Sequence, residues 1–373
     1  MPKIIRVMVI DDSIVYRSWL IRSLSADPRF EVVGFAGNAY EARQKIPLLK
    51  PDIMTLDIEM PGMSGIEFLK KLLPVHPIPV ILVSSLNLKV FDALEAGAVD
   101  FVRKPDGQNG LSKELFINTL KTKLVMGAGA RIRLPRAQET PSRAVPPAAS
   151  QKVTRTGAPG REYTSQSRPS HLHDSPKNGF GRRPAPVIAI GASTGGTEAI
   201  LEVVRNFPAS TPGVVITQHM PAGFTSMYAE RLNRICAMEV REAKNGDRLH
   251  PGLILLAPGG MQMRLVPLGG SYSVSVLPGE KVNGHRPSVD VLFDSVAAHA
   301  REQAIGVLLT GMGADGAAGL LRMRKNGAFT IGQDKDSCVV YGMPMEAWKI
   351  GAVCRQLPLN AIGQAVLNRL SCF

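Results

Sequence analysis

The sequence predicts an α/β protein in which a flexible linker joins two doubly wound domains. Short apolar runs alternate with stretches whose apolar residues recur every three or four positions, first over residues 1–125 and again over residues 185–373. A Pro- and Arg-rich segment over residues 126–184 separates these two regions. The 373 residues are too many for one ordinary core, and the 45% apolar content suffices for two cores.

The first domain is predicted to be a five-stranded parallel sheet with helices on both faces. Apolar runs predict strands at residues 4–10, 30–35, 52–56, 80–83 and 99–102. Helical spacing occurs between them, over residues 13–26, 39–49 and 65–73. A sheet of this kind binds its ligands beyond the carboxyl ends of its strands.

Polar residues stand at those predicted strand ends: Asp11 and Asp12 after the first strand, Asp57 after the third, Ser84 after the fourth and Lys104 after the fifth. Three carboxylates at one edge repel each other unless a cation joins them, and a hard ion such as Mg²⁺ suits such oxygen ligands. Lys104 and Ser84 would then contact a phosphoryl group on Asp57. Taken singly, each residue could also be a turn residue or a helix cap.

These residues, together with the run DIEMPGMSG over 57–65, resemble the receiver domain of two-component response regulators, which has a flavodoxin-like fold. The resemblance covers residues 1–125 and implies that a partner histidine kinase phosphorylates Asp57. It implies that Mg²⁺ is bound by Asp11, Asp12, Asp57 and the backbone carbonyl of Glu59. It also implies a phosphorylation switch formed by Ser84, Phe101 and Lys104.

The net charge of +13 comes mostly from the segment between the two domains. From Gly127 to Pro186 there are eleven Lys and Arg against three Asp and Glu, a surplus of eight, together with nine prolines. Such a segment buries too little apolar surface to fold, so a flexible linker is expected, with only loose attraction to acidic surfaces. The charge therefore does not indicate specific nucleic-acid binding.

In the second domain, three motifs follow predicted strands at residues 186–191, 214–217 and 304–310. They are GASTGG with Ser193, QHMP with His219 and GMGADG with Asp315. Ser193 could lie on an exposed strand-to-helix turn as a nucleophile, or its glycine loop could hold the phosphate of a nucleotide. Alone, His219 could be a turn histidine and Asp315 a helix cap. Neighbouring strand ends would bring the three together.

The order Ser193, His219, Asp315, with NGHRPSVD at 283–290 and YGMP at 341–344, resembles the catalytic domain of the chemotaxis protein-glutamate methylesterases. The likeness covers residues 184–370. It implies hydrolysis of glutamyl methyl esters on chemoreceptor cytoplasmic domains, with release of methanol, and deamidation of receptor glutamines. Backbone N–H groups near Thr194 and Met312 are the expected oxyanion donors, and no cofactor is expected for hydrolysis.

One residue departs from the family pattern. Many members carry a histidine where Gln262 stands, which questions the positioning of substrate more than the chemistry. His285 and Arg286 are candidates to line the cleft, while Ser288 and Asp290 could cap the helix that follows. His250 and His299 are expected to be structural or solvated.

Other features of the sequence indicate where in the cell the protein is expected. The apolar run at residues 4–10 is interrupted by Arg6, so neither a signal peptide nor membrane insertion is expected. The four cysteines lack metal-site spacing and suit a cytoplasmic protein, recruited to chemoreceptor arrays. The resemblance further implies that the unphosphorylated receiver packs over the catalytic edge. The alternatives are a DNA-binding or a nucleotide-binding response regulator.

Overall fold

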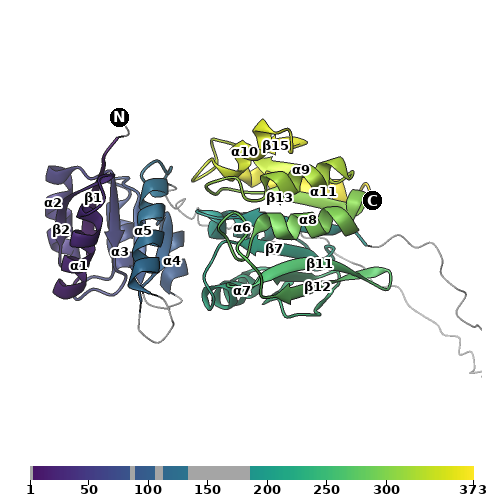
Figure 1. Cartoon of the computed structure of the whole chain (residues 1–373), viewed down its shortest axis with the longest axis horizontal. Coiled ribbons are helices and arrows are strands. Elements are labelled where there is room, and N and C mark those ends of the chain that lie inside the picture. Colours follow the sequence, from purple (N-terminus) through teal and green to yellow (C-terminus); the bar gives the residue numbers. More distant parts are fainter. Residues whose placement is uncertain (1–2, 85–88, 106–111, 133–184) are drawn as a thin grey trace, which may run out of the picture. The chain divides into compact units, whose positions relative to one another are not determined.

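A computed structural model of the chain describes residues 3–84, 89–105, 112–132 and 185–373. The predicted linker lies outside these residues from position 133 to position 184. The described residues form two α/β domains, coloured purple to blue and teal to yellow in Figure 1.

The first domain contains the predicted five-stranded sheet, and every pairing in it is parallel. The strand order is β2-β1-β3-β4-β5. Its strands are β1 Ile5–Ile10, β2 Phe30–Ala36, β3 Ile53–Leu56, β4 Val80–Ser84 and β5 Asp100–Arg103. Its helices are α1 Ile14–Ser25, α2 Ala39–Leu49, α3 Gly65–Leu72, α4 Lys89–Glu95 and α5 Lys113–Gly127. Helix α5 thus continues two residues past the predicted boundary at 125.

Helices cover both faces of this sheet (Figure 1). Successive residues of a strand point to opposite faces, so Val7 and Val9 of β1 pack with α1 and α5, while Met8 and Ile10 pack with α2, α3 and α4. Near-continuous burial along β1, β3 and β4 is what a sheet covered on both sides requires.

The second domain is built on a seven-stranded parallel sheet of order β15-β14-β13-β6-β7-β10-β8. Its strands are β6 Val187–Ala192, β7 Val214–Gln218, β8 Glu239–Glu242, β10 Leu253–Leu256, β13 Ala304–Leu308, β14 Phe329–Gln333 and β15 Arg355–Leu357. Helices α6 Gly196–Val204, α7 Phe224–Ile235 and α11 Leu359–Leu370 cover one face, and helices α8 Val289–His299, α9 Ala317–Lys325 and α10 Met343–Lys349 cover the other.

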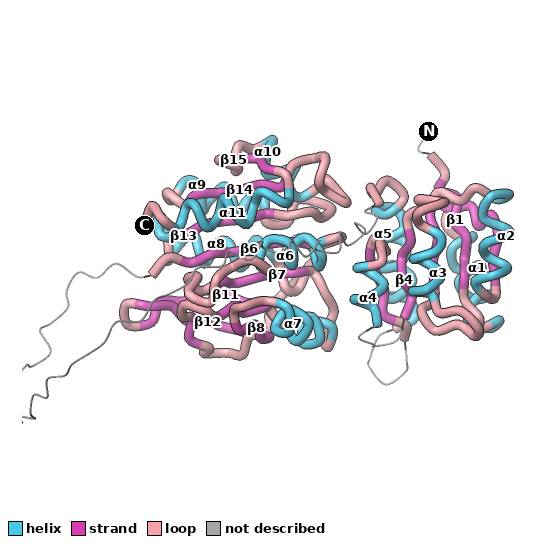
Figure 2. Tube along the Cα trace, turned by 180° about the vertical axis from the view of Figure 1, so that it is seen from behind, coloured by secondary structure: helices cyan, strands magenta, loops and turns pink. Residues whose placement is uncertain are grey.

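A small antiparallel sheet, which the sequence did not predict, packs beside α8. Strands β11 Gln262–Leu268 and β12 Ser271–Leu277 form a hairpin around Gly269 and Gly270, and the short strand β9 Arg248–Leu249 pairs with β12. Both turn glycines have positive φ, at 52° and 82°, which is the pattern of a type I′ turn. Figure 2 labels both strands of the hairpin, β11 and β12.

Strand β6 has β7 on one side and β13 on the other. The chain passes from β6 to β7 in one direction and later adds β13 and β14 in the other, so the strand order reverses at β6. Open parallel sheets bind ligands at such a reversal, beyond the carboxyl ends of the strands. The three predicted motifs of this domain follow β6, β7 and β13.

Candidate active site and phosphorylation site

Ser193 lies in the tight turn between β6 and α6. Its backbone N–H donates to the Thr310 carbonyl at 3.0 Å, and its carbonyl accepts from Gly196 N–H at 2.7 Å. Gly195, at the N-terminus of α6, has a φ of +75°, a left-handed conformation that glycine adopts without strain. The turn therefore holds the Ser193 hydroxyl at the carboxyl edge of the sheet, beside the start of a helix.

His219 links Ser193 to Asp315. Its Nδ1 lies 3.1 Å from the Ser193 hydroxyl and its Nε2 lies 2.7 Å from an Asp315 carboxylate oxygen. Strand β7 is next to β6, whereas Asp315 follows β13 on the far side of β6. Nδ1, the ring nitrogen closer to the backbone, thus contacts Ser193 at the end of the adjacent strand β6. The distal nitrogen, Nε2, reaches past that strand end to Asp315.

This arrangement determines the proton positions on neutral His219. The Asp315 carboxylate only accepts hydrogen bonds, so Nε2 must carry the proton. Nδ1 is then free to accept from the Ser193 hydroxyl. In serine proteases Nε2 faces the serine and Nδ1 faces the aspartate. This site contains the same three groups with the two imidazole nitrogens exchanged.

Asp315 is 2% exposed, and donors surround its carboxylate. Apart from His219, these donors are the Asn283 amide, the Ser288 hydroxyl and the backbone N–H groups of Val289 and Asp290, at 2.7–3.2 Å. The last two belong to the N-terminal end of α8, whose dipole favours an anion. Burial alone would raise the pKa of Asp315, but the hydrogen bonds from His219, Asn283 and Ser288 hold it well below its usual range.

Asn283 and Gly284 form the turn of a short hairpin in which Val282 and His285 exchange both backbone hydrogen bonds. Both turn residues have positive φ, at 53° and 81°, which is the pattern of a type I′ turn. The turn directs the Asn283 amide to Asp315. It also places the His285 ring flat against His219, with ring centroids 3.6 Å apart.

The loop that follows β13 runs beside Ser193. A Cβ added to Gly311 would lie 2.7 Å from the Ser193 Cβ, so only glycine permits this approach. Met312 is next in this loop and is 37% exposed, while Thr194 is 4% exposed and directly follows Ser193. Both residues therefore border Ser193; their role as oxyanion donors stays a prediction.

Of the remaining candidates from the sequence, Ser288 and Asp290 make buried hydrogen bonds, whereas His250 and His299 do not lie in the site. Ser288 is the N-cap residue of α8 but donates its hydroxyl to Asp315, and Asp290 accepts from Gly319 N–H at 2.6 Å. His250 and His299 are exposed, as expected. Sequence reasoning did not assign a role to the Asn283 amide, although the Asn-Gly pair is a known turn signal. It also did not identify Gln218, whose amide donates to the carbonyls of Ser193 and His219.

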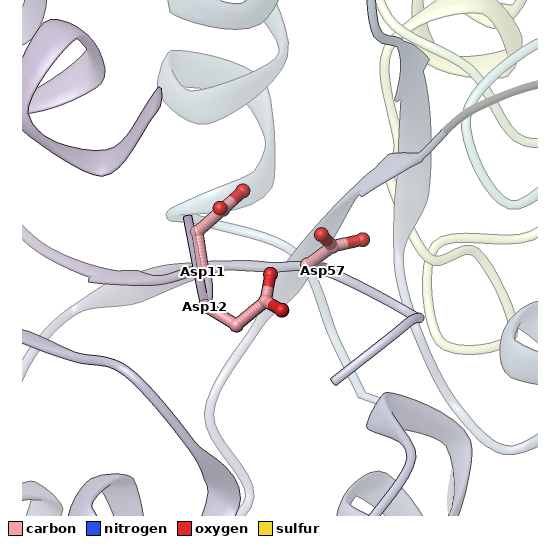
Figure 3. A group of neighbouring side chains, drawn as sticks. All are labelled: Asp11, Asp12 and Asp57. Carbon is pink, nitrogen blue, oxygen red and sulfur yellow. The ribbon is translucent and has the colours of Figure 1, made fainter. Parts of the chain in front are cut away.

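In the first domain, the carboxylates of Asp11, Asp12 and Asp57 gather at the ends of β1 and β3 (Figure 3). One oxygen from each lies within 4.8 Å of the others. Lys104 donates to Asp11 at 2.9 Å and to Asp57 at 2.5 Å. Three carboxylates with no nitrogen or sulfur among them form a donor set that fits a hard divalent cation such as Mg²⁺.

Burial affects the pKa values of Asp57 and Lys104 at this edge of the sheet. It raises the pKa of Asp57 even though Lys104 hydrogen-bonds to it. For Lys104, burial acts to lower the pKa, but the hydrogen bond to Asp57 outweighs it and the pKa is raised. Ser84 and Phe101, the other switch candidates, are 2% and 4% exposed. The backbone of Glu59 is tied to Asp57, because its N–H donates to the carboxylate at 3.3 Å.

The described residues of both domains belong to one compact unit, and several contacts join them. The Thr194 hydroxyl donates to Asp100 at 2.6 Å, and the rings of Phe101 and Phe224 lie 4.5 Å apart. A cavity of about 600 Å³ is bordered by Ser193 and His219 together with α5 residues of the first domain. Arg286 also borders this cavity, as expected for a cleft residue.

Two family profiles match the chain. The response regulator receiver domain matches residues 7–116, and the CheB methylesterase profile matches residues 188–366. A Syntrophomonas wolfei protein named protein-glutamate methylesterase/protein-glutamine glutaminase 2 is 51% identical over 98% of both chains. A protein of the same activity name from Syntrophotalea carbinolica is 46% identical over 100% of this chain and 99% of its own length.

Among solved structures, the catalytic domain of Thermotoga maritima CheB methylesterase is 34% identical. It covers 50% of this chain and 98% of its own, with a TM-score of 0.49. Within the described part of the chain, no helix has both the length and the apolar content needed to cross a bilayer.

Proposed function

Because the chain belongs to the family of protein-glutamate methylesterase/protein-glutamine glutaminases, we propose that it hydrolyses glutamyl methyl esters in proteins and deamidates specific glutamines. The observation that carries the proposal is the contact of His219 with both Ser193 and Asp315. The family match favours this function over the DNA-binding and nucleotide-binding alternatives.

The reaction begins when the Ser193 oxygen attacks the ester carbonyl carbon and its proton moves to Nδ1 of His219. Collapse of the tetrahedral intermediate breaks the bond to the methoxy oxygen, which takes the proton from Nδ1 and leaves as methanol. Water then attacks the acyl-serine, again giving its proton to Nδ1, and the glutamate is released with Ser193 reprotonated. With a glutamine substrate the same steps release ammonia.

Asp315 supports both proton transfers without moving a proton itself. Its carboxylate holds the Nε2–H tautomer of His219 and stabilises the imidazolium that forms when Nδ1 is protonated. The other donors around Asp315 keep it ionised and fixed in place. Backbone N–H groups near Thr194 and Met312 would stabilise the oxyanion, a contribution of about 3–4 kcal/mol for one donor in enzymes where it was removed.

We propose that the substrates are the cytoplasmic domains of chemoreceptors, as the family's role in chemotactic adaptation suggests. A chemotaxis histidine kinase would then be the phosphodonor of the first domain, and the enzyme would work in the cytoplasm at receptor arrays. Ester hydrolysis by Ser193, His219 and Asp315 needs no cofactor, because these three groups supply the nucleophile, the base and its counterion.

Asp57 is the proposed phosphoacceptor. Asp11, Asp12, Asp57 and the Glu59 carbonyl would hold Mg²⁺, which when bound neutralises phosphate charge. Lys104 already contacts Asp57 and would pair with a phosphoryl group there, while Ser84 and Phe101 would respond to it.

Control of the esterase by this phosphorylation would act through the contacts between the domains. Asp100 and Phe101 of β5 contact Thr194 and Phe224, and Thr194 is the residue after the proposed nucleophile. Phosphorylation that moves Phe101 would disturb these contacts and expose the cavity at Ser193. The unphosphorylated receiver would therefore restrain the esterase.

The proposal is tested by methanol release from methylated receptor membranes, with and without acetyl phosphate. Wild-type protein should release methanol, and acetyl phosphate should increase the rate. Ser193→Ala should release none under either condition, while Ser226→Ala, which removes another hydroxyl of the same domain, should behave as wild type. Methanol release by Ser193→Ala would rule out the proposed nucleophile.

A further inference from the structure

Gln262, the first residue of β11, makes three hydrogen bonds to the segment of residues 280–288. Its amide nitrogen donates to the carbonyls of Glu280 at 2.9 Å and His285 at 3.3 Å, and its amide oxygen accepts from Ser288 N–H at 2.9 Å. The side chain is 2% exposed, so water does not compete for these bonds. One buried amide thus joins three points of a single loop.

This loop carries three of the groups that surround the proposed catalytic pair of His219 and Asp315. Asn283 and Ser288 donate to Asp315 at 2.8 and 2.7 Å, and the His285 ring stacks on His219. Two of the three Gln262 hydrogen bonds are made with the backbone of His285 and Ser288, which are two of these residues. The amide is therefore one hydrogen bond away from residues that contact both His219 and Asp315.

We propose that Gln262 is a positioning residue of the esterase: it holds the 280–288 loop so that Asn283, His285 and Ser288 keep Asp315 and His219 in register with Ser193. The inference rests on the proposed function of that site. Gln262 does not touch the reacting atoms; it acts through the loop. The hairpin that bears it, β11–β12, thereby contributes to an active site built from the parallel sheet.

The chemistry of the amide explains why this side chain suits the position. A glutamine offers two N–H donors and an acceptor oxygen, and all three bonds use that set. A neutral histidine offers one donor and one acceptor, so it can keep the bond from Ser288 N–H and one of the two carbonyl bonds. Methionine has nearly the same length and keeps none of the strong bonds.

The test compares Gln262→Met and Gln262→His with wild type in the full-length protein. Gln262→Met should lower kcat for methanol release about 10- to 100-fold, because small displacements of catalytic groups cost rates of this order, while KM changes less than about threefold. Gln262→His should lose less than about tenfold, by keeping two of the bonds. In proton NMR, the low-field resonance of His219 Nε2–H should shift or broaden in Gln262→Met.

A matched control separates positioning from stability. Thr330→Val removes a buried hydroxyl that bonds Ala352 and Cys354, away from this loop. It should lower the midpoint of thermal unfolding yet leave kcat and the low-field resonance unchanged. If Gln262→Met does not fold, Gln262→Glu takes its place: a carboxylate keeps the acceptor for Ser288 N–H but loses both donors, so the same fall in kcat and the same change in the resonance are expected.

The outcomes are distinct. Wild-type kcat and an unshifted resonance in the Gln262 variants would overturn the inference, even with lowered stability. A fall in kcat with a shifted resonance would support it. Methanol release by Ser193→Ala would instead show that the proposed function of this site is wrong, whatever the Gln262 variants do.

Discussion

The imidazole of His285 lies parallel to that of His219, with the ring planes 8° apart. Burial and then the nearby His219 lower the pKa of His285 to about 4, so His285 is neutral near pH 7. During acyl transfer His219 becomes positively charged, and a neutral ring at its face can stabilise that cation. A second cation there would oppose it.

The lowered pKa of His285 lets us predict how the free energy of unfolding depends on pH. In unfolded chains a histidine binds its proton near pH 6.5, whereas His285 in the folded protein binds it only near pH 4. Between these values the unfolded state holds more protons, so the free energy of unfolding should fall as the pH decreases from about 6.5 to about 4. Urea denaturation of the full chain at several pH values measures this.

The matched variant is His285→Phe, which keeps an aromatic ring but cannot be protonated. Its free energy of unfolding should decrease less over the same pH range. Its kcat near pH 7 should stay within about threefold of wild type, since an aromatic face still covers His219. An equal pH-dependent loss of stability in both proteins would contradict the assignment of the effect to His285.

Replacing Asp315 by asparagine tests the reversed imidazole. The amide introduced by Asp315→Asn would no longer favour the Nε2–H tautomer of His219, so Nδ1 would lose its role as the base toward Ser193. In a serine protease the corresponding change lowers kcat by about 10⁴, and we expect a loss of similar size in methanol release. Asp294→Asn, on the partly exposed side of α8, is the control and should retain activity. Comparable activity in both variants would argue against the triad.

Gly311→Ala tests the close approach of the loop after β13 to the nucleophile. The added methyl group would lie 2.3 Å from the Met343 sulfur and 2.7 Å from the Ser193 Cβ, so both must shift. We expect about 1–3 kcal/mol of destabilisation, typical of overpacked sites, and reduced kcat. Gly129→Ala, where an added methyl meets nothing within 4 Å, should be neutral on both counts. Thermal unfolding measures the stability of both variants, and methanol release measures their kcat. Wild-type stability and kcat in Gly311→Ala would disprove the tight contact.

Asp57→Asn should abolish the increase in methanol release caused by acetyl phosphate, because an amide does not accept the phosphoryl group. Basal release should stay close to that of wild type. Lys104→Met should weaken the response as well, since Lys104 contacts Asp57. Lys71→Met, which removes an exposed ion pair with Glu67, is the control and should respond normally. Undiminished stimulation of Asp57→Asn would remove Asp57 as the phosphoacceptor.

The local pattern of the chain was sufficient to predict much of both domains. Alternating periodicities located the five strands of the first sheet and the strands before Ser193, His219 and Asp315, because buried parallel strands form apolar runs that polar residues end. The antiparallel hairpin was missed. Its strands, 262–268 and 271–277, mix buried and exposed positions irregularly, so neither period stands out.

The surroundings of Asp315 were also not predictable. Alone, Asp315 suggested a cap for the helix that follows it, yet that helix, α9, begins at Ala317 with Gly316 as its N-cap residue and has no side-chain cap. The carboxylate instead accepts from Val289 and Asp290 at the start of another helix, α8. Such a partner lies about 25 residues away in sequence, and only the packing of α8 beside the sheet brings it near.

By itself the sequence determined which side chains end which strands, because apolar periodicity and glycine turns are local properties of the chain. Tertiary structure alone decided that β6 lies between β7 and β13, and hence that His219 faces Ser193 with Nδ1 and Asp315 with Nε2. It also decided that Gln262 reaches the loop beside them. Strand order and distant hydrogen bonds arise from the packing of whole elements, which no short stretch of sequence contains.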